Sequence, residues 1–184
     1  MVTQYAPRLL TAEDFLKIDF GEQKAELDKG VIRMMAGGSR RQARVASNII
    51  GALVRRLGDS PCAPYGSDMA IKTRPDSIRF PDVSVLCGKE DAAHDDDLTE
   101  DLPVVLVEVL SASTSRSDLK EKLPEHQALG SVDTVLLVDI ATERVQVVQR
   151  TGPRGWNKDG HDEPFDVPLP ALGIILPHAE IFAR

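Results

Sequence analysis

The sequence predicts an α/β fold with a central mixed sheet flanked by helices, and three observations support this class. Residues 103–110, PVVLVEVL, form a run of β-branched and leucine residues broken by one charge, which is typical of a strand buried on both faces. A helical segment over residues 115–129 leads from this run to a second one, DTVLLVDI at 133–140. Apolar residues recur at helical spacing across residues 39–58 and indicate a long amphipathic helix.

Local signals define the elements that precede the central strand. Thr11 and Asp14 form a capping-box pattern that starts a short helix over residues 11–18. Residues 25–36, AELDKGVIRMMA, predict a tight β-hairpin with its turn at 28–30. The long helix that follows carries arginines on its polar face, and Gly58 ends it. Its apolar positions are Val45, Ile49, Leu53 and Leu57.

The remaining segments complete the sheet. Strands are expected near residues 65–73 and 77–87, before an acidic loop over residues 88–101. The run RVQVVQR at 144–150 predicts an antiparallel neighbour of the second apolar strand. A tail rich in Gly and Pro, with the lone Trp156, is expected to finish the domain.

Composition bounds the class of protein. With 184 residues, 42% of them apolar and 28% charged, the chain is expected to fold as one soluble domain over residues 1–184. No segment has the length and hydropathy of a signal peptide or a membrane span, so we expect a cytoplasmic protein. Cys62 and Cys87 belong to no CxxC or Cys/His cluster. We therefore expect two reduced thiols, with neither a disulfide nor a structural zinc site.

Charge is unevenly distributed along the chain. The net charge of −7 argues against a protein that coats nucleic acid. Residues 31–80 carry nine Lys or Arg against three Asp or Glu, whereas residues 81–143 carry four against fifteen. Basic residues that could bind phosphate and acidic residues that could bind a cation thus occupy different segments, which suits a metal-dependent enzyme acting on a polyanion. Solvated surface faces would explain the same asymmetry.

Glu108 places a charge inside the central apolar strand. An isolated ionised carboxylate there costs several kcal/mol, so it must be paired with a cation, bound to a metal, or protonated. Asp82 lies in another predicted strand, and adjacent strands could bring both carboxylates onto one Mg²⁺, which takes one or two protein carboxylates. Two strand-end acids bonded to backbone N–H groups or to an arginine would be a purely structural explanation.

Four ordered motifs resemble the Uma-two family within the PD-(D/E)XK nuclease superfamily. They are AELDKG at 25–30, RFPDVSVL at 79–86, LVEVLSAST at 106–114, and SDLKEK at 117–122 followed by LGSVDTVLLVD at 129–139. PD alone is a weak signal, but the four motifs span most of the chain in the family's order. The resemblance implies a restriction-endonuclease-like fold and hydrolysis of DNA phosphodiester bonds with Mg²⁺ or Mn²⁺.

The resemblance also implies roles for individual residues. Asp82 and Glu108 would hold the divalent cation, together with the carbonyl of Val109, and Glu26 would be an additional acid of the site. In the superfamily pattern a lysine stands two residues after the second acid. Here that position is Leu110.

The family resemblance offers Lys122 in place of the missing lysine, with Asp118 in support four residues earlier on the same helix face. A lysine that reaches the reacting phosphate from another element can still orient or activate the attacking water. A surface Asp–Lys pair, worth about 0.3–0.5 kcal/mol, is the alternative explanation. Departures from the family pattern are Arg41 for His, His126 for an aromatic residue, and Thr134–Val135 for Tyr–Trp, which leave altered substrate handling or a partly degenerate site open.

The predicted activity is metal-assisted hydrolysis of DNA by a two-fold homodimer, because cutting both strands of a duplex needs two related sites. Two alternatives remain: a catalytically silent DNA- or protein-binding module, and a hydrolase that uses the same acids on a small phosphoester. The predicted phosphate contacts, which solubility would also explain, are Arg33, Arg40, Arg41 and Arg44. The histidines without ligand spacing, expected at the surface, are His94, His161 and His178.

Overall fold

The computed structural model describes residues 9–88, 98–100, 102–110, 116–160 and 163–184, with side chains in the fourth range described from Leu119 onward. Within these residues, no helix is long and apolar enough to cross a membrane. The described elements are α1 (Ala12–Leu16), β1 (Ala25–Asp28), β2 (Val31–Met34), α2 (Arg40–Leu57), β3 (Cys62–Gly66), β4 (Ala70–Arg74), β5 (Ser77–Arg79), β6 (Val83–Cys87), β7 (Thr99–Glu100), β8 (Pro103–Leu110), α3 (Arg116–Ala128), β9 (Thr134–Asp139), β10 (Arg144–Arg150), β11 (Trp156–Gly160), β12 (Val167–Leu169), the 3-10 turn η2 (Pro170–Leu172), β13 (Ile174–Leu176) and α4 (His178–Ile181).

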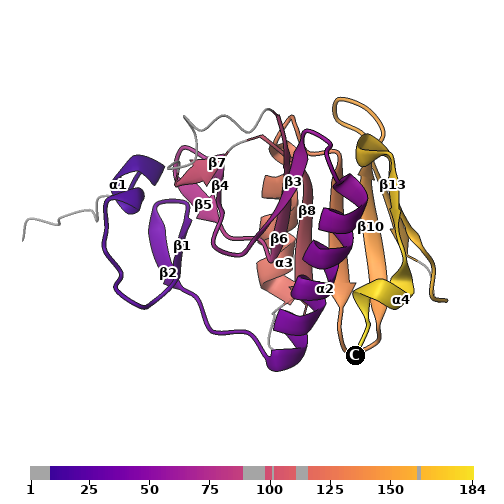
Figure 1. Ribbon diagram of the computed structural model, residues 1–184. Coiled ribbons are helices and arrows are strands. Elements are labelled where there is room, and N and C mark those ends of the chain that lie inside the picture. The colour runs from indigo at the N-terminus through magenta and orange to yellow at the C-terminus, as the bar shows by residue number, and fades with distance from the viewer. Residues whose placement is uncertain (1–8, 89–97, 101, 111–115, 161–162) are drawn as a thin grey trace, which may run out of the picture.

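The strands form two main sheets that stand side by side (Figure 1). The larger sheet has the order β11-β10-β9-β8-β6-β3, with β8 parallel to β9 and antiparallel to β6. The smaller sheet has the order β2-β1-β5-β4-β7, and β12 pairs separately with β13. The predicted α/β class, with a central mixed sheet flanked by helices, is confirmed, and PVVLVEVL is a central strand.

Helices α2 and α3 cover opposite faces of the larger sheet. Val105 and Val107 of β8 belong to the core cluster beneath α2, whereas Leu106 belongs to the cluster shared with α3. Successive side chains of a strand point to opposite faces, which explains this division. Glu108 and Leu110 therefore share the α3 face with Leu106.

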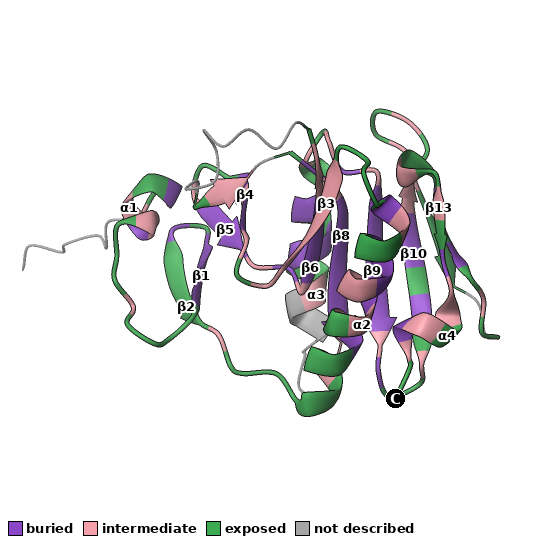
Figure 2. Ribbon diagram, in the orientation of Figure 1, coloured by how far each residue is buried: buried purple, intermediate pink, exposed green. Residues whose placement is uncertain are grey.

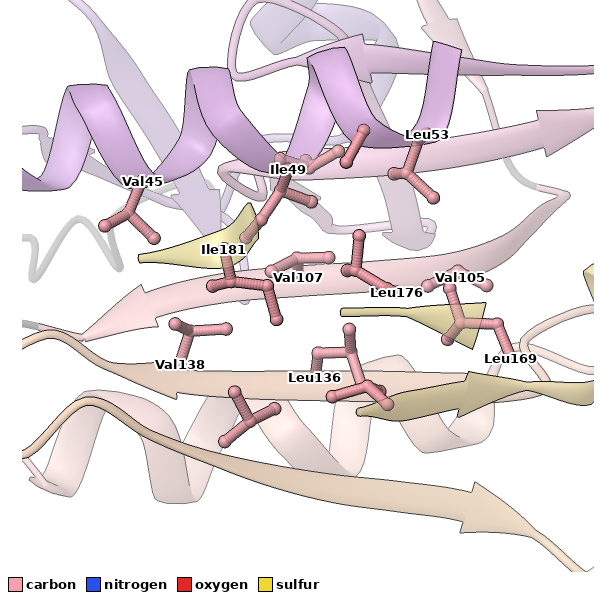
Figure 3. Close-up of a cluster of buried hydrophobic side chains, with 14 of the residues drawn as sticks. Val45, Ile49, Leu53, Val105, Val107, Leu136, Val138, Leu169, Leu176 and Ile181 are labelled. Carbon is pink, nitrogen blue, oxygen red and sulfur yellow. The ribbon is translucent and has the colours of Figure 1, made fainter. Parts of the chain in front are cut away.

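One apolar stripe packs α2 onto the sheet. Val45, Ile49 and Leu53 lie over β8 and β9 and meet residues of β12, β13 and α4 (Figure 3). Each of the three is at most 3% exposed, and burying each such side chain is worth about 1.5–3 kcal/mol. A capping box between Ser39 and Gln42 starts the helix, at the residue where the predicted segment begins.

The predicted hairpin forms as β1 and β2. Lys29 and Gly30 occupy its turn with φ angles of 49° and 80°, the left-handed conformations that a two-residue hairpin turn requires. A Cβ at Gly30 would come within 2.6 Å of the Leu9 Cβ, so this position needs glycine. Strand β1 is buried, whereas β2 is an exposed edge (Figure 2).

The structure contains more strands than the sequence pattern predicts. Four strands, β3 to β6, occupy the region where two were expected, because residues 67–69 interrupt the first expected strand and residues 80–82 interrupt the second. The Gly/Pro-rich tail adds β11 to the sheet edge and places β12, β13 and α4 against α2. Its scattered apolar residues complete the core, which their spacing along the sequence does not reveal.

The expectation of two reduced thiols is wrong. Cys62 and Cys87 form a disulfide. They are direct partners in the antiparallel register between β3 and β6, with Cα atoms 4.0 Å apart. The strand pairing brings them together although they stand 25 positions apart in the sequence.

Candidate active site

The PD motif lies where the chain passes from the smaller sheet to the larger one. Asp82 follows β5 and directly precedes β6. Because Val83 of β6 pairs with Val107 of β8, Asp82 lies beside the carboxyl end of β8. Its Oδ2 accepts a hydrogen bond from the backbone N–H of Val109 at 2.7 Å. The backbone of β8 thus fixes the position of this carboxylate.

Glu108 projects from β8 toward α3, where His126 meets it. Glu108 is 9% exposed and His126 is fully buried. His126 Nε2 lies 2.9 Å from Glu108 Oε1, and since a carboxylate only accepts, Nε2 donates the proton. Burial alone would raise the pKa of Glu108, but the His126 hydrogen bond and nearby positive charge outweigh it and lower the pKa. Glu108 is therefore an ionised, oriented carboxylate.

Lys122 reaches the same place from α3. It stands one helical turn before His126, on the same face of the helix. Its Nζ donates to Glu26 Oε1 at 2.9 Å, and its charge acts on both Asp82 and Glu108. Glu26, on the buried strand β1, also accepts from a backbone N–H at Oε1. The structure brings these four predicted residues together, 96 positions apart at the extremes.

A buried arginine supports the smaller sheet's side of this cluster. Arg79 is 1% exposed, and its guanidinium donates to Glu26, Asp28 and Glu125. Two of these bonds form a fork to Glu125 of α3, at 2.8 and 2.9 Å. Neighbouring carboxylates raise the pKa of Arg79 although burial opposes this, so it is charged throughout the accessible pH range. Arg79 thereby ties α3 to β1 and β5.

The charges of this network balance in a way that singles out two acids. Among the described residues, three cations, namely Arg79, Lys122 and Arg33, bond the three acids Glu26, Asp28 and Glu125. Asp82 and Glu108 are two further acids beside them: Asp82 accepts from the Val109 N–H, and Glu108 meets His126, which forms an ion pair with it when the imidazole is protonated. Burial and the charge of Glu108 raise the pKa of Asp82 to about 6. The metal-free protein therefore holds two mutually repelling carboxylates at one point.

The donor set fits a divalent cation. Mg²⁺ needs only one or two protein carboxylates because it keeps several of its waters, and Asp82 and Glu108 supply that number. No group of three or more His, Cys, Asp or Glu side chains suited to a metal occurs within the described part of the chain. The Val109 carbonyl accepts from Gln42 Nε2 at 3.1 Å and retains a second lone pair.

The predicted DNA-binding arginines lie on two elements. Arg40, Arg41 and Arg44 are exposed at the start of α2, which the Gln42 bond to Val109 holds against the end of β8. Arg41 also pairs with Glu143 at 2.7 Å. Arg33 of β2 forms an ion pair with Asp28 at 2.6 Å, so part of its positive charge is neutralised within the protein.

Four other residues named from the sequence do not contribute to the described site. The side chain of Asp118, and the whole of His94 and His161, lie outside the described residues. His178 is half-buried and not on an open surface, because its Nε2 donates to the Glu143 carbonyl at 2.7 Å. It lies on α4.

Sequence reasoning missed Arg79, Glu125 and the hydrogen bond of His126. Arg79 has a visible signal, since it stands between two apolar residues in a strand three residues before Asp82. Glu125 and His126 follow Lys122 by three and four residues, which is the spacing of one helix face. Their partners are distant in sequence, so only the packing of α3 on β5 and β8 identifies them.

The solved structures include a close match in fold. The crystal structure of a "putative nuclease belonging to DUF820" from Anabaena variabilis ATCC 29413 matches with a TM-score of 0.76 and 18% identity, over 95% of this chain and 98% of that one. This chain thus has the restriction-endonuclease-like fold. The Synechocystis sp. (strain ATCC 27184 / PCC 6803 / Kazusa) protein sll1609 is 27% identical over 158 residues, 85% of this chain and 89% of that protein. The chain belongs to the Uma2 family, described as "Putative restriction endonuclease", which matches residues 12–176.

Proposed function

We propose that this protein is a divalent-cation-dependent endonuclease that hydrolyses DNA phosphodiester bonds. Membership of the Uma2 family supports a nuclease. The observation that carries the proposal is the pair Asp82 and Glu108, two neighbouring carboxylates outside the Arg79 ion pairs, with the charge of Lys122 acting on both. A bound Mg²⁺ or Mn²⁺ would supply Lewis acidity toward the scissile phosphate and lower the pKa of a coordinated water.

The chain's own residues would divide the remaining work. Asp82 and Glu108 hold the cation, the Val109 N–H fixes Asp82, and His126 fixes Glu108 through Oε1. Lys122 orients the attacking water and offsets the negative charge that grows on the phosphate as the new P–O bond forms and the leaving oxygen departs. Glu26 holds the Lys122 ammonium in place, at 2.9 Å.

DNA would approach the end of the molecule where α2 begins. Arg40, Arg41 and Arg44 lie there on the first turns of the helix, exposed and next to the end of β8. Arginines that contact phosphates supply most of the sequence-independent affinity of such proteins. Arg33 would add to this surface from β2.

A homodimer is part of the same proposal. Duplex cleavage needs two sites related by a two-fold axis, and closed two-fold pairing is the commonest oligomer. Strand β2 supports it, because Val31, Ile32 and Met34 are 51%, 36% and 53% exposed on a sheet edge. An apolar edge strand of this kind readily pairs with a second strand. The proposed location is the cytoplasm, although a disulfide such as Cys62–Cys87 is rare in that compartment.

One observation favours a second candidate, a catalytically silent DNA-binding module with the nuclease fold. Leu110 occupies the position of the superfamily lysine, and Lys122 is bonded to Glu26 in this structure. A silent module would still bind DNA through the α2 arginines. It would not cleave DNA, and substituting Glu108 or Lys122 would leave its DNA binding unchanged.

Cleavage of supercoiled plasmid in Mg²⁺ or Mn²⁺, against EDTA, separates the two candidates. We expect nicked and linear products from the parent and none from Glu108→Gln or Lys122→Ala. The matched controls are Glu180→Gln, a carboxylate paired on α4, and Lys120→Ala, an exposed lysine on the same helix as Lys122. Both controls should cut like the parent. Equal cleavage by Glu108→Gln and the parent would exclude this site.

A further inference from the structure

A cavity of about 290 Å³ lies on the α3 face of the larger sheet, and one of its lining residues, Leu137, is the strand partner of Glu108. In the strand register, Leu137 of β9 pairs with Glu108, Gln146 of β10 pairs with Leu137, and Gly160 of β11 pairs with Gln146. Directly paired residues point to the same face of a sheet. Leu137, Gln146 and Gly160 all line the cavity, so it extends across the sheet from the proposed cation site.

The cavity is open because its outer end lacks a side chain. Gly160 is the last of these paired residues and has no side chain, and a Cβ there would lie 3.6 Å from Gln146 Nε2. Leu119 of α3 and Leu110 of β8 also line the cavity. Apolar surface thus stands at the position where the superfamily lysine would place an ammonium group. The volume lies just below the ~300–1,000 Å³ of drug-sized ligand sites, which suits a single planar ring system.

The lining combines an apolar floor with a polar rim. Leu110, Leu119 and Leu137 supply the floor, and Leu137 is 4% exposed. Gln146 and Arg144 supply the rim and are exposed. The Gln amide both donates and accepts, and Arg144 adds a positive charge. This chemistry suits a flat ligand with apolar faces and a hydrogen-bonding edge.

Other ligand classes fit the lining less well. An inorganic anion would bond Arg144 but would gain nothing from three leucines. A cation would find oxygen ligands on only two lining side chains, the Asp139 carboxylate, whose Oδ1 already accepts from the N–H groups of Ala141 and Thr142, and the Gln146 amide. A nucleobase has both the apolar faces and the donor and acceptor edge that the lining offers.

We propose that this cavity binds one nucleobase of the DNA strand held at Asp82 and Glu108, with Gln146 contacting the base edge. The proposal rests on the proposed function, since a nuclease substrate brings a base to within one strand spacing of Glu108. A base in the cavity would anchor the strand beside the scissile phosphate. Gln146 and Arg144 would then influence which base is accepted.

Methyl NMR of protein labelled at Leu and Val tests the pocket without any cleavage step. The four deoxynucleoside 5′-monophosphates are titrated into metal-free protein, and deoxyribose 5-phosphate serves as the matched ligand that lacks a base. We expect saturable shifts of the Leu110, Leu119 and Leu137 methyls with dissociation constants of about 1 mM or tighter for at least one nucleotide. Deoxyribose 5-phosphate should leave these methyls unshifted.

A filled pocket should lose the ligand. Gly160→Val places a side chain beside Gln146 and should weaken nucleotide binding by about tenfold or more. Gly152→Val is the matched control, in the turn at the far end of the same β10–β11 hairpin, where a Cβ has no neighbour within 4 Å. It should bind like the parent, and thermal melting checks that both variants fold.

Three results would overturn the pocket: no methyl shift with any nucleotide, equal shifts with deoxyribose 5-phosphate, or unchanged binding in folded Gly160→Val. The results that would count against the endonuclease differ from those that would count against the pocket. Nucleotide binding without DNA cleavage would count against the endonuclease alone. Cleavage without nucleotide binding would count against the pocket alone.

Discussion

Asp82→Asn removes a charge that the metal-free protein holds against the carboxylate of Glu108. Burial and that neighbouring charge raise the pKa of Asp82 from 3.8 to about 6. A carboxyl whose folded pKa is raised contributes stability that is fully present below pH 3.8 and is lost as the pH rises through about 6. Since one pKa unit corresponds to about 1.4 kcal/mol, ionised Asp82 costs at most about 3 kcal/mol above pH 7.

The variant should recover this free energy. Asn keeps an oxygen that can accept from the Val109 N–H, so the backbone contact survives. In EDTA, we expect Asp82→Asn to exceed the parent in free energy of unfolding by about 1–3 kcal/mol at pH 8, with the advantage disappearing toward pH 4. In excess Mg²⁺ this advantage should shrink, because the parent gains about 2.7 kcal/mol at one hundred times its dissociation constant and the variant gains less.

Urea unfolding at several pH values, with and without Mg²⁺, measures these differences. Comparing variant with parent cancels the titration of all other groups. Asp59→Asn, at an exposed position after α2, controls for the loss of one negative charge. The reasoning fails if Asp82→Asn is no more stable than the parent at pH 8 in EDTA, or if Mg²⁺ stabilises both equally.

Three further perturbations test the surrounding network. Arg79→Met should lower the free energy of unfolding in urea by about 3–5 kcal/mol, because it leaves buried carboxylates without their cation. Arg55→Met is the control, since the Arg55 side chain is 64% exposed, and it should cost under about 1 kcal/mol. Similar losses in the two variants would contradict a stabilising role of the buried Arg79 ion pairs. Lys122→Ala should lose plasmid cleavage yet keep a Mg²⁺-induced rise in Tm; loss of that rise would make Lys122 part of the cation site. Reducing the Cys62–Cys87 bond, which spans 25 positions, should cost about 3 kcal/mol; an unchanged Tm in dithiothreitol would contradict this.

The sequence predicts well those elements whose signal is local. Periodicity and caps define α2, and the run PVVLVEVL identifies β8 as a central strand. The turn at Lys29–Gly30 follows from residue types alone. These features depend on interactions within a few residues, so no knowledge of the tertiary fold is needed.

What the sequence leaves out depends on contacts between distant segments. The buried charge of Glu108 signals that a partner exists, but His126 becomes its partner only when α3 packs on β8. The disulfide depends on the register of β3 with β6. Arg79 reads as an ordinary strand residue until β1, β5 and α3 surround it with carboxylates.

The most direct test of the cation site is a crystal of the protein soaked in Mn²⁺, with anomalous scattering recorded at the manganese edge. We expect one peak per chain, at about 2.1–2.2 Å from a carboxylate oxygen of Asp82 and of Glu108, with Lys122 next to it. Glu108→Gln crystals under the same soak should lack the peak. A parent crystal with manganese at other acidic residues and none between Asp82 and Glu108 would contradict the account.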